Sequence, residues 1–289
     1  MFGLFLVNKP AGPTSHDIVA DVRRRLGRGV RVGHAGTLDP FAEGVLVLCV
    51  GAATRLASYV QARPKRYRAV VRLGASSSTD DREGEIAPTP GASAAAESAV
   101  RDAVGRFLGV IEQVPPAHSA VHVAGQRAYK LARAGQRLEL PPRNVTVYSI
   151  DLVRYEYPQA EIDVCCGSGT YIRALARDIG SALGVGGYCE KLTRTAVGEF
   201  RIENAVGPEA LDPCRDLLEP LLAVSHLPRV IATGEQIPRL RHGNLLALAE
   251  PLEPGEVAVV DAESRLLALG EVRPDGRTLQ PRKAFVTEK

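Results

Sequence analysis

Apolar and polar residues follow three different patterns along the first quarter of the chain. Residues 44–51 form a continuous apolar run between two glycines, which predicts a strand buried on both faces, and residues 5–8 predict a second, shorter strand. Residues 67–73 alternate in polarity, so Tyr67 should face inward with the apolar residues of that strand. Apolar residues at helical spacing predict a helix over residues 17–26, with capping side chains at residues 14–17.

The remaining pattern predicts more strands and a second domain. Residues 94–108 predict a helix, and residues 145–151 and 161–166 predict strands. After a glycine turn, Thr170 should cap a helix with apolar residues at 172, 175, 176, 179 and 183. A further helical stretch is expected near 212–224. The tail has glycines spaced between short apolar runs, so we expect one domain over residues 1–226 and a small β-rich domain over residues 227–289.

Composition is that of a globular protein with a substantial core. The chain has 289 residues, of which 45% are hydrophobic. Its five cysteines are odd in number and form no CxxC pair, which favours reduced core thiols over disulfides or a zinc site. The apolar run at the start is too short for a signal peptide, and no run approaches transmembrane length. We therefore expect a cytoplasmic protein with no membrane partner.

Positive charge is concentrated near the start of the chain. The net charge of the whole chain is +3, but residues 1–72 hold 12 Lys and Arg against 4 Asp and Glu, a net charge of +8. Such an asymmetry is typical of a protein that binds a polyanion such as nucleic acid. A solvated arginine-rich face would give the same charge count, so charge alone leaves both interpretations open.

The most unusual local pattern lies directly before the long apolar strand. Residues 31–44 read RVGHAGTLDPFAEG, so a single carboxylate, Asp39, precedes a proline inside a glycine-rich loop. Pro40 restricts Asp39 to extended backbone geometry, and the glycines allow close approaches that side chains would block. The loop therefore suits a held catalytic carboxylate, although an ordinary Asp-Pro turn would have the same local sequence.

Four segments, taken in order, closely resemble the TruB family of tRNA pseudouridine-55 synthases over about the first 200 residues. They are GHAGTLDP at residues 33–40, KRY at 65–67, GTYIR at 169–173 and LTRT at 192–195. The resemblance implies an α+β fold: a pseudouridine-synthase catalytic domain with a central mixed, mainly antiparallel sheet flanked by helices. It also implies a small β-rich, PUA-like C-terminal domain that meets the acceptor-stem side of tRNA.

The resemblance also implies a role for each residue of the site. By this similarity Asp39 is the catalytic aspartate, Tyr67 stacks on the target base, Arg173 pairs with the aspartate and Leu192 helps to wall the pocket. His34 would occupy space in the opened RNA loop, and Tyr171 would help to bind the substrate. Taken singly, Tyr67 and Leu192 would also suit ordinary core packing, and Arg173 would suit a structural ion pair or a phosphate at a helix N-terminus.

The chemistry explains why such residues are needed. Pseudouridine formation breaks the bond from N1 to C1′ of uridine, rotates the base and joins C5 to C1′, so it consumes no second substrate and needs no cofactor or metal. The aspartate must be ionised either to attack C1′ or to deprotonate C2′, and the sequence leaves both mechanisms open. A neighbouring Arg173 would keep Asp39 anionic, and base flipping would bring the uridine to it.

The expected partner is the T-arm stem-loop of tRNA, recognised largely by its shape. Phosphate contacts are expected from the basic residues near the loop: Arg23, Arg24, Arg31, Arg63, Lys65 and Arg66. The short tail favours a stand-alone, guide-independent enzyme that acts as a monomer without an obligate protein partner. The alternatives are a guide-RNA-dependent synthase of the archaeal or eukaryotic type and a non-catalytic RNA-binding or chaperone protein.

Three residues depart from the family pattern: Ala35, Glu43 and His118. None of them removes a catalytic group, and Glu43 would either weaken RNA binding or pair with a nearby arginine. Asp80 and Asp81 could provide the second acid of a glycosidase, or simply form a turn. The pair of His118 and His122 has no acidic or cysteine partner for a metal, and the glycines of residues 184–187 follow a helix, which is the wrong context for a dinucleotide-binding loop.

Overall fold

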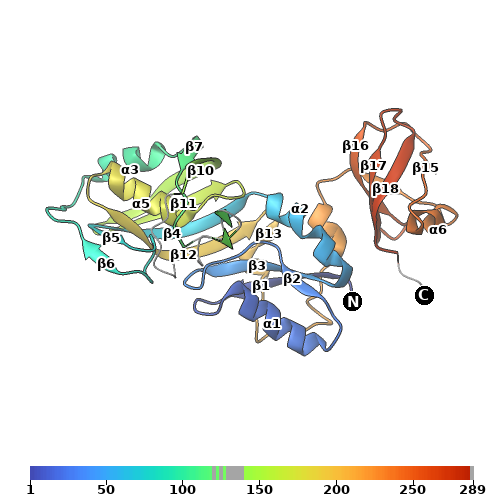
Figure 1. Cartoon of the computed structure of the whole chain (residues 1–289), viewed down its shortest axis with the longest axis horizontal. Helices are drawn as coiled ribbons and strands as arrows, with labels where there is room; N and C mark the ends of the chain where they lie inside the picture. The colour runs from blue at the N-terminus through green and yellow to red at the C-terminus, as the bar shows by residue number, and fades with distance from the viewer. Residues whose placement is uncertain (119–121, 124–125, 128–139, 287–289) are drawn as a thin grey trace.

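The computed structural model describes residues 1–118, 122–123, 126–127 and 140–286. The larger part is a nine-stranded sheet with helices, and a five-stranded sheet forms the C-terminal part (Figure 1). The strands of the large sheet are β1 (Gly3–Lys9), β2 (Val32–His34), β3 (Glu43–Val50), β4 (Lys65–Leu73), β7 (Gly109–Gln113), β10 (Arg143–Glu156), β11 (Gln159–Cys166), β12 (Gly187–Val197) and β13 (Phe200–Arg201). Its helices are α1 (Ser15–Leu26), α2 (Ala57–Ala62), α3 (Glu97–Gly105) and α5 (Ile172–Ala182), with 3-10 turns η1 (Gly51–Leu56), η2 (Ile202–Asn204) and η3 (Pro220–Val224).

Two short hairpins and the C-terminal elements complete the chain. The hairpins pair β5 (Ala75–Ser77) with β6 (Ile86–Pro88) and β8 (His122–Val123) with β9 (Gln126–Arg127). The C-terminal elements are β14 (Arg229–Ile231), α6 (Gln236–Arg241), β15 (Leu246–Ala247), β16 (Gly255–Val260), β17 (Leu266–Val272) and β18 (Thr278–Ala284). Their strand order is β14-β16-β17-β18-β15. None of the helices among the described residues has the length and apolar character needed to cross a bilayer.

The order of the large sheet brings strands from early and late in the chain together. It runs β1-β3-β12-β4-β11-β10-β7, so β12, which is late in the chain, lies between β3 and β4. β12 is parallel to β3 and antiparallel to β4, whereas the other strand pairs described in this sheet are antiparallel. The sheet is therefore mixed and mainly antiparallel, as predicted. Its centre joins the loop that precedes β3 to the strands of Tyr67 and Leu192.

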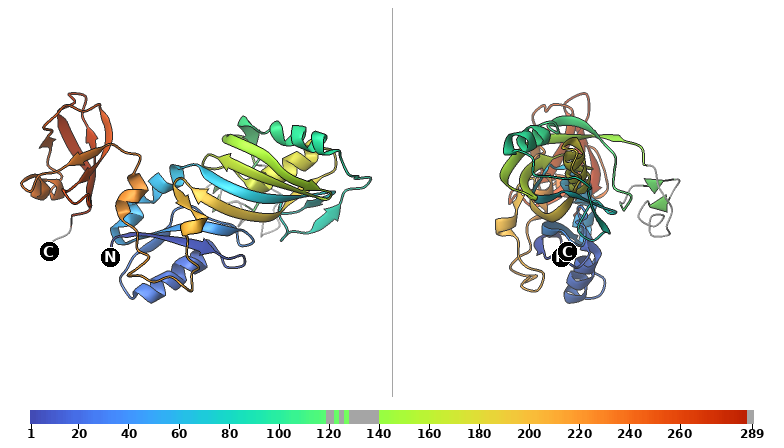
Figure 2. Two further views of the ribbon diagram at one scale, coloured as in Figure 1. Left: turned by 180° about the vertical axis from the view of Figure 1, so that it is seen from behind. Right: turned by 90° about the vertical axis from the view of Figure 1, so that its left-hand side faces the viewer.

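Each face of the sheet has its own hydrophobic core. One core packs α1, α3 and α5 against inward side chains such as Val7, Leu46, Leu48 and Ile162. In the left view of Figure 2, the blue helix α1 lies below β1 and β3, and the green helix α3 lies above the other end of the sheet. The second core packs the opposite side chains of β1 and β3 against η1, α2, η3 and part of the C-terminal sheet. Because β3 gives side chains to both cores, its continuous apolar run is explained by burial on two faces.

Most of the predicted elements are confirmed, and two details are wrong. The helix expected near 212–224 is only the 3-10 turn η3, because the Asp212 carboxylate accepts the amides of Cys214 and Arg215 and so stabilises a turn in place of a helix. The helix predicted after Thr170 begins at Ile172, and the Thr170 hydroxyl donates to the carbonyl of Gly167 (3.1 Å) without capping the helix. α1 has the predicted cap, a reciprocal capping box between Thr14 and Asp17.

Arg63, which was expected to contact RNA phosphates, is instead a buried structural residue. Only 7% of it is exposed, and its guanidinium donates to the carbonyls of Leu222 (2.9 Å) and Ala223 (3.1 Å) and to the Ser225 hydroxyl (3.0 Å). It also forms an ion pair with Glu199. Arg63 therefore fixes the segment that leads into the C-terminal sheet.

A glycine in α5 allows the helix to lie directly against the start of β12. A Cβ atom added at Gly180 would lie 2.3 Å from the backbone of both Gly186 and Gly187. We therefore expect Gly180→Ala to lower the free energy of unfolding by about 1–3 kcal/mol, although alanine is the better helix former. Urea denaturation followed by circular dichroism measures this change.

Gly105 provides the matched control, because it is also a helical glycine and a Cβ atom there would meet open space. Gly105→Ala should leave the free energy of unfolding unchanged or raise it by up to about 1 kcal/mol. Equal effects of the two substitutions would show that the close approach of α5 and β12 does not limit the choice of residue at Gly180.

Candidate active site

The loop that carries Asp39 is held from one side by a buried arginine. Arg194, on β12, is 2% exposed, and its guanidinium donates three hydrogen bonds to backbone carbonyls. The acceptors are Gly36 (3.1 Å) and Thr37 (3.2 Å) in the loop and Val45 (2.7 Å) in β3. A buried guanidinium with three acceptors fixes the backbone on either side of Asp39.

A buried lysine holds the other side of the same loop. The Lys9 ammonium donates to the carbonyls of Pro10 (2.9 Å), Pro13 (2.8 Å) and Pro40 (3.2 Å), and burial lowers the pKa of Lys9 to about 8. Gly44 ends the loop with a φ of 103°, and a Cβ atom there would lie 2.3 Å from the Arg194 carbonyl oxygen. The loop therefore has little freedom to move Asp39.

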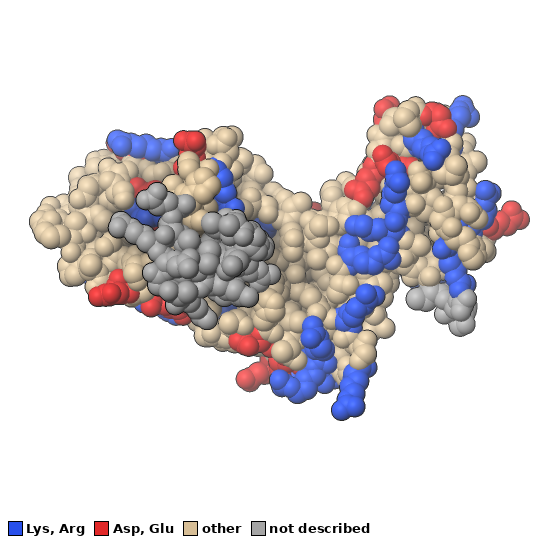
Figure 3. Space-filling model, viewed as in Figure 1, with Lys and Arg blue, Asp and Glu red and all other residues tan. Residues whose placement is uncertain are grey.

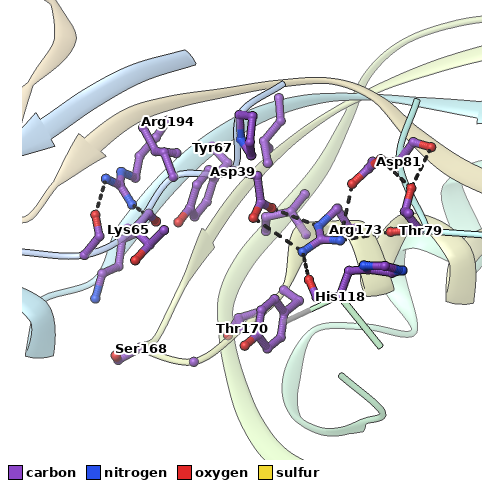
Figure 4. A pocket seen from close by; sticks show the side chains of 18 of the residues that line it. Asp39, Lys65, Tyr67, Thr79, Asp81, His118, Ser168, Thr170, Arg173 and Arg194 are labelled. Atoms are coloured by element: carbon purple, nitrogen blue, oxygen red, sulfur yellow. Dashed lines mark hydrogen bonds and ion pairs between the residues drawn. The ribbon is translucent and has the colours of Figure 1, made fainter. Parts of the chain in front are cut away.

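Asp39 meets Arg173 as the resemblance implied, and Arg173 also meets a second carboxylate. The Arg173 Nε atom lies 2.8 Å from Oδ2 of Asp39, and its Nη1 atom lies 3.2 Å from Oδ2 of Asp81. The same guanidinium donates to the carbonyls of Thr79 (2.9 Å) and His118 (2.9 Å), and its side chain is 4% exposed (Figure 4). The geometry fixes the guanidinium on several sides and directs its Nε edge at Asp39.

The first turn of α5 carries Arg173, and the neighbouring chain holds that turn. Tyr171 occupies the N-cap position, where the Gln113 side chain accepts its amide (2.8 Å) and donates to its carbonyl (3.1 Å). The Arg143 guanidinium lies over the Tyr171 ring, 4.9 Å from its centroid. The Gln113 side chain thus binds both the amide and the carbonyl of Tyr171 and holds the start of α5 in place.

The charge state of Asp39 reflects two opposing influences. Burial raises the pKa of Asp39 above its ordinary value of 3.8, and the adjacent Asp81 raises it further. The Arg173 guanidinium lowers it, but the net shift is upward. The Asp39 side chain still exposes 34% of its surface, which opens into the adjoining cavity. Asp39 is thus a poorly solvated carboxylate beside a cation, with one side free for a substrate.

A cavity of about 810 Å³ opens beside Asp39, and most of the predicted site residues line it. They are Asp39, Tyr67, Tyr171, Arg173 and Leu192. Tyr67 and Leu192 come from neighbouring strands, since Leu192 pairs with Ala69 in the register of β12 and β4. Figure 4 shows the Tyr67 ring beside Asp39, on the opposite side from Arg173. The cavity thus combines an aromatic face, an apolar wall and a carboxylate.

His34 has a different position from the other predicted site residues. It is half-buried and is not among the described residues that line the cavity. Its ring packs edge-on against His16 with centroids 5.1 Å apart, and His16 does line the cavity. Burial and the nearby His16 lower the pKa of His34. A contact of His34 with an opened RNA loop stays a prediction.

The basic residues expected to bind phosphates occupy several environments. Those exposed on the surface near α1 are Arg23, Arg24 and Arg31. Arg66 is exposed on the face of β4 opposite Tyr67, where its Nε atom lies 2.7 Å from Asp163. Lys65 is buried and lines the cavity itself. Strand alternation separates these two neighbours, which the run of basic residues could not reveal.

The three departures from the family pattern leave the site intact. Ala35 is buried at the start of the loop. Glu43 accepts a hydrogen bond from the Thr193 hydroxyl (3.0 Å), a threonine and not one of the arginines considered from the sequence. His118 takes part through its backbone carbonyl, which accepts from Arg173. That contact does not depend on the type of side chain at residue 118.

Asp80 and Asp81 are both engaged with other groups. Asp80 forms an ion pair with Arg177 (2.8 Å). Asp81, besides facing Arg173, accepts the Thr79 hydroxyl (2.6 Å) and the Glu83 amide (2.9 Å). This geometry assigns Asp81 to orienting the arginine, whereas the second acid of a glycosidase needs a carboxyl group free to exchange a proton.

The metal and dinucleotide patterns discounted from the sequence can be compared with the described residues. No cluster of His, Cys, Asp and Glu among the described residues has the geometry of a metal site. His118 is described, whereas the side chain of His122 lies outside the described residues. The glycines of residues 184–187 form the turn from α5 into β12, so they follow a helix and open a strand.

Sequence reasoning missed three residues that hold the site: Asp81 as a partner of Arg173, and Arg194 and Lys9 as clamps of the loop. Only Lys9 had a local signal, because it continues the inward alternation of Phe5 and Val7 in β1 and so had to be buried. The contacts of Arg194 join β12 to β3 and the Asp39 loop, and that of Asp81 joins the segment between β5 and β6 to α5, so no local pattern encodes them.

Comparison with known proteins gives one family across the whole chain. A sequence model described as "TruB family pseudouridylate synthase (N terminal domain)" matches residues 23–172. The tRNA pseudouridine synthase B of Microcystis aeruginosa is 43% identical and covers 98% of each chain. That of Leifsonia xyli is 46% identical, covering 96% of this chain and 95% of its own.

Two solved structures share the fold. A chain in an H/ACA RNP bound to a substrate RNA containing 2′-deoxyuridine matches with a TM-score of 0.74 and 26% identity, over 99% of this chain and 86% of that one. A chain in a Cbf5-Nop10-Gar1 complex matches with a TM-score of 0.75 and 26% identity, over 99% and 85%. The likeness therefore includes the C-terminal sheet as well as the large sheet.

The raised pKa of Asp39 predicts an effect on stability. An acid whose folded-state pKa lies above its unfolded value stabilises the fold most when protonated, and this contribution is lost as pH rises through the folded pKa. We therefore expect Asp39→Asn to raise the free energy of unfolding at pH 7, with the gain shrinking as pH falls toward 4. Urea denaturation at a series of pH values measures this dependence.

Asp17 provides a control with the opposite sign. The Thr14 hydroxyl and amide lower the pKa of Asp17, so its ionised form stabilises the fold above the unfolded pKa. Asp17→Asn should therefore lower the free energy of unfolding at pH 7, and this loss should disappear on acidification. A loss of stability at pH 7 in Asp39→Asn would contradict the assigned direction of the Asp39 pKa shift.

Proposed function

The chain belongs to the TruB family of pseudouridylate synthases, and we propose that it isomerises uridine 55 in the T-arm loop of tRNA to pseudouridine. The support for tRNA as the substrate is the name shared by relatives that are 43–46% identical over nearly their whole length. The observation that carries the proposal is the ion pair of Asp39 and Arg173 in a cavity shared with Tyr67 and Leu192.

The reaction needs an ionised carboxylate at the ribose and a surface that holds a detached uracil. The bond from N1 to C1′ breaks, the bond from C5 to C1′ forms, a proton leaves C5 and a proton is taken up at N1. Asp39 serves either as the nucleophile at C1′ or as the base at C2′, and both routes use the same ionised form. Arg173 favours that form by placing its positive charge 2.8 Å from the carboxylate.

Base flipping is part of the proposal because Asp39 lies inside the protein. A uridine stacked in a tRNA loop would have to leave its stack to reach a carboxylate between β3 and α5. Tyr67 offers an aromatic face for the extruded base, and burial raises the pKa of Tyr67, so its phenol is neutral. Leu192 provides the apolar wall beside it. Such contacts would hold the uracil while its glycosidic bond is broken.

The proposed tRNA surface combines the catalytic part with the C-terminal sheet. Lys and Arg side chains gather over α1 and along the junction with the C-terminal sheet in the face that Figure 3 shows. The last turn of α1 alone contributes Arg23, Arg24 and Arg25. Exposed cations of this kind bind phosphates without reading sequence, so they would position the tRNA while shape selects it. The C-terminal sheet is proposed to act as a PUA-like contact for the acceptor-stem side.

We propose that the enzyme acts alone, as a monomer in the cytoplasm. The chain is more similar to the relatives named tRNA pseudouridine synthase B, at 43–46% identity, than to the chain of the H/ACA RNP, at 26%. One chain supplies the acid, its arginine partner and the apolar walls of the cavity. Its five cysteines are free, which suits a reducing compartment.

The decisive experiment uses the purified protein and a T-arm stem-loop labelled with tritium at C5 of the target uridine. Tritium should be released without any guide RNA or protein partner, and an RNA with cytidine at the target position should give no pseudouridine. Asp39→Asn should lower the rate of release by at least about a hundredfold and leave RNA affinity within a few-fold of the wild type.

Asp80→Asn is the matched control. Asp80 is a neighbouring carboxylate that faces Arg177, and asparagine tolerates its positive φ of 60°. This variant should keep most of the rate. Release that depends on an added guide RNA would refute stand-alone action, and unchanged release in Asp39→Asn would refute the role of Asp39.

A further inference from the structure

Three buried cations line the cavity, a fourth holds the Asp39 loop beside it, and one of the four is poorly compensated. Arg173 faces two carboxylates, and Arg194 and Lys9 each donate to three backbone carbonyls. Lys65 is also buried, with 7% exposed, yet its ammonium has one hydrogen-bond partner among the described residues, the carbonyl of Gln61. An ammonium carries three donors, and burying it with so few partners is unfavourable unless a ligand completes them.

Lys65 lies close to the turn that precedes α5. Lys65 is the first residue of β4 and shares the cavity face of that strand with Tyr67. In the sheet register it lies opposite Cys166, directly before the turn of residues 167–170. Figure 4 shows Lys65 and Ser168 on the same side of Asp39, with Arg173 on the other. The two sides of the cavity thus differ, because the acidic partners of the buried cations lie on the Arg173 side.

We propose that Lys65 and the turn of residues 167–170 form a subsite for an RNA backbone phosphate that flanks the extruded uridine. The inference rests on the proposed function and assigns a second ligand group to the same cavity. The turn lines the cavity and offers the Ser168 hydroxyl, together with the backbone amides of Ser168 and Gly169. None of these three groups has a hydrogen-bond partner among the described residues. A nucleotide that leaves its stack carries its phosphates with it, so an anion arrives where donors are free.

Electrostatics agree with an anionic ligand. Burial and the Arg194 guanidinium from β12 lower the pKa of Lys65 to about 8. The Cys166 thiol, which faces Lys65 from β11, has its pKa raised by burial to about 12 and is therefore neutral. From α2 only the Gln61 carbonyl reaches the ammonium. No carboxylate lies within 4.0 Å of Lys65 among the described residues, so a phosphate would be its first anionic partner.

The first test compares Lys65→Met and Lys65→Arg with the wild type in binding a T-arm stem-loop. Lys65→Met should weaken RNA affinity by about tenfold, the effect of one charge-assisted hydrogen bond, and reduce the slope of log Kd against log salt by about 0.7. It should also raise stability to urea, because it removes a buried ammonium. A purely structural lysine would show the reverse, with lower stability and unchanged affinity.

Arg68→Met is the matched control, since Arg68 lies on the same strand but on its opposite face, where it pairs with Glu161 and Asp163. The RNA affinity of Arg68→Met should stay within about twofold of the wild type.

In pH titrations the RNA affinity of the wild type should fall as pH rises through about 8, where free Lys65 loses its proton. Lys65→Arg should bind RNA and move this loss to higher pH, because arginine stays charged.

A double-mutant cycle identifies the phosphate. Methylphosphonate linkages, which are uncharged, replace the phosphate on the 5′ side of the target uridine, the phosphate on its 3′ side, or one in the distal stem. The nucleotide before each methylphosphonate linkage carries a 2′ modification, and the experiment measures only RNA binding. At one flanking linkage the substitution should weaken binding by the wild type but have little further effect on Lys65→Met. Additive losses at both flanking linkages would overturn the subsite. Because these assays measure binding, their failure is distinct from an absence of pseudouridine formation by the wild type.

Discussion

The contact on which the site depends is the guanidinium of Arg173 between two carboxylates. One of them, Asp39, is open to the cavity, while Asp81 is buried and held by other donors. A single buried arginine facing only Asp39 would be free to swing with it. Asp81 and the backbone carbonyls fix the guanidinium first, so Asp39 meets a charge that is already in place. The positive charge then counters the desolvation that the catalytic cavity imposes on its carboxylate.

Tertiary contacts that are distant in sequence make this geometry possible. Arg173 lies in the first turn of α5, and Gly180 allows that helix to lie against the start of β12. The same strand carries Leu192 into the cavity and Arg194 under the loop of Asp39. The central place of β12 therefore couples the position of the arginine to that of the aspartate. A shift of this strand would disturb both partners at once.

The sequence predicted elements better than it predicted the environment of charges. The two-faced strand β3 and the capped helix α1 follow from short-range patterns, and the ordered motifs identified Asp39, Tyr67, Arg173 and Leu192. The run of basic residues around Lys65 did not reveal where each of these side chains would lie. Arg63 anchors the segment that leads into the C-terminal sheet, Lys65 lines the cavity and Arg66 lies on the opposite face of the sheet. The end of α2 and the alternation of side chains along β4 determine these three positions. The net charge carries no information about them.

The second core has a consequence for how the protein is made. Leu4 and Val45, from the start of the chain, share that core with Leu269 and Phe285 from its end, and the Phe2 ring stacks on that of Phe285 at 5.1 Å. A ribosome releases the first strand long before the last. The outer face of β1 and β3 therefore stays partly uncovered during translation, until the final strand has left the exit tunnel. Completion of the catalytic scaffold is in this sense a late event in synthesis, although its reactive residues are encoded early.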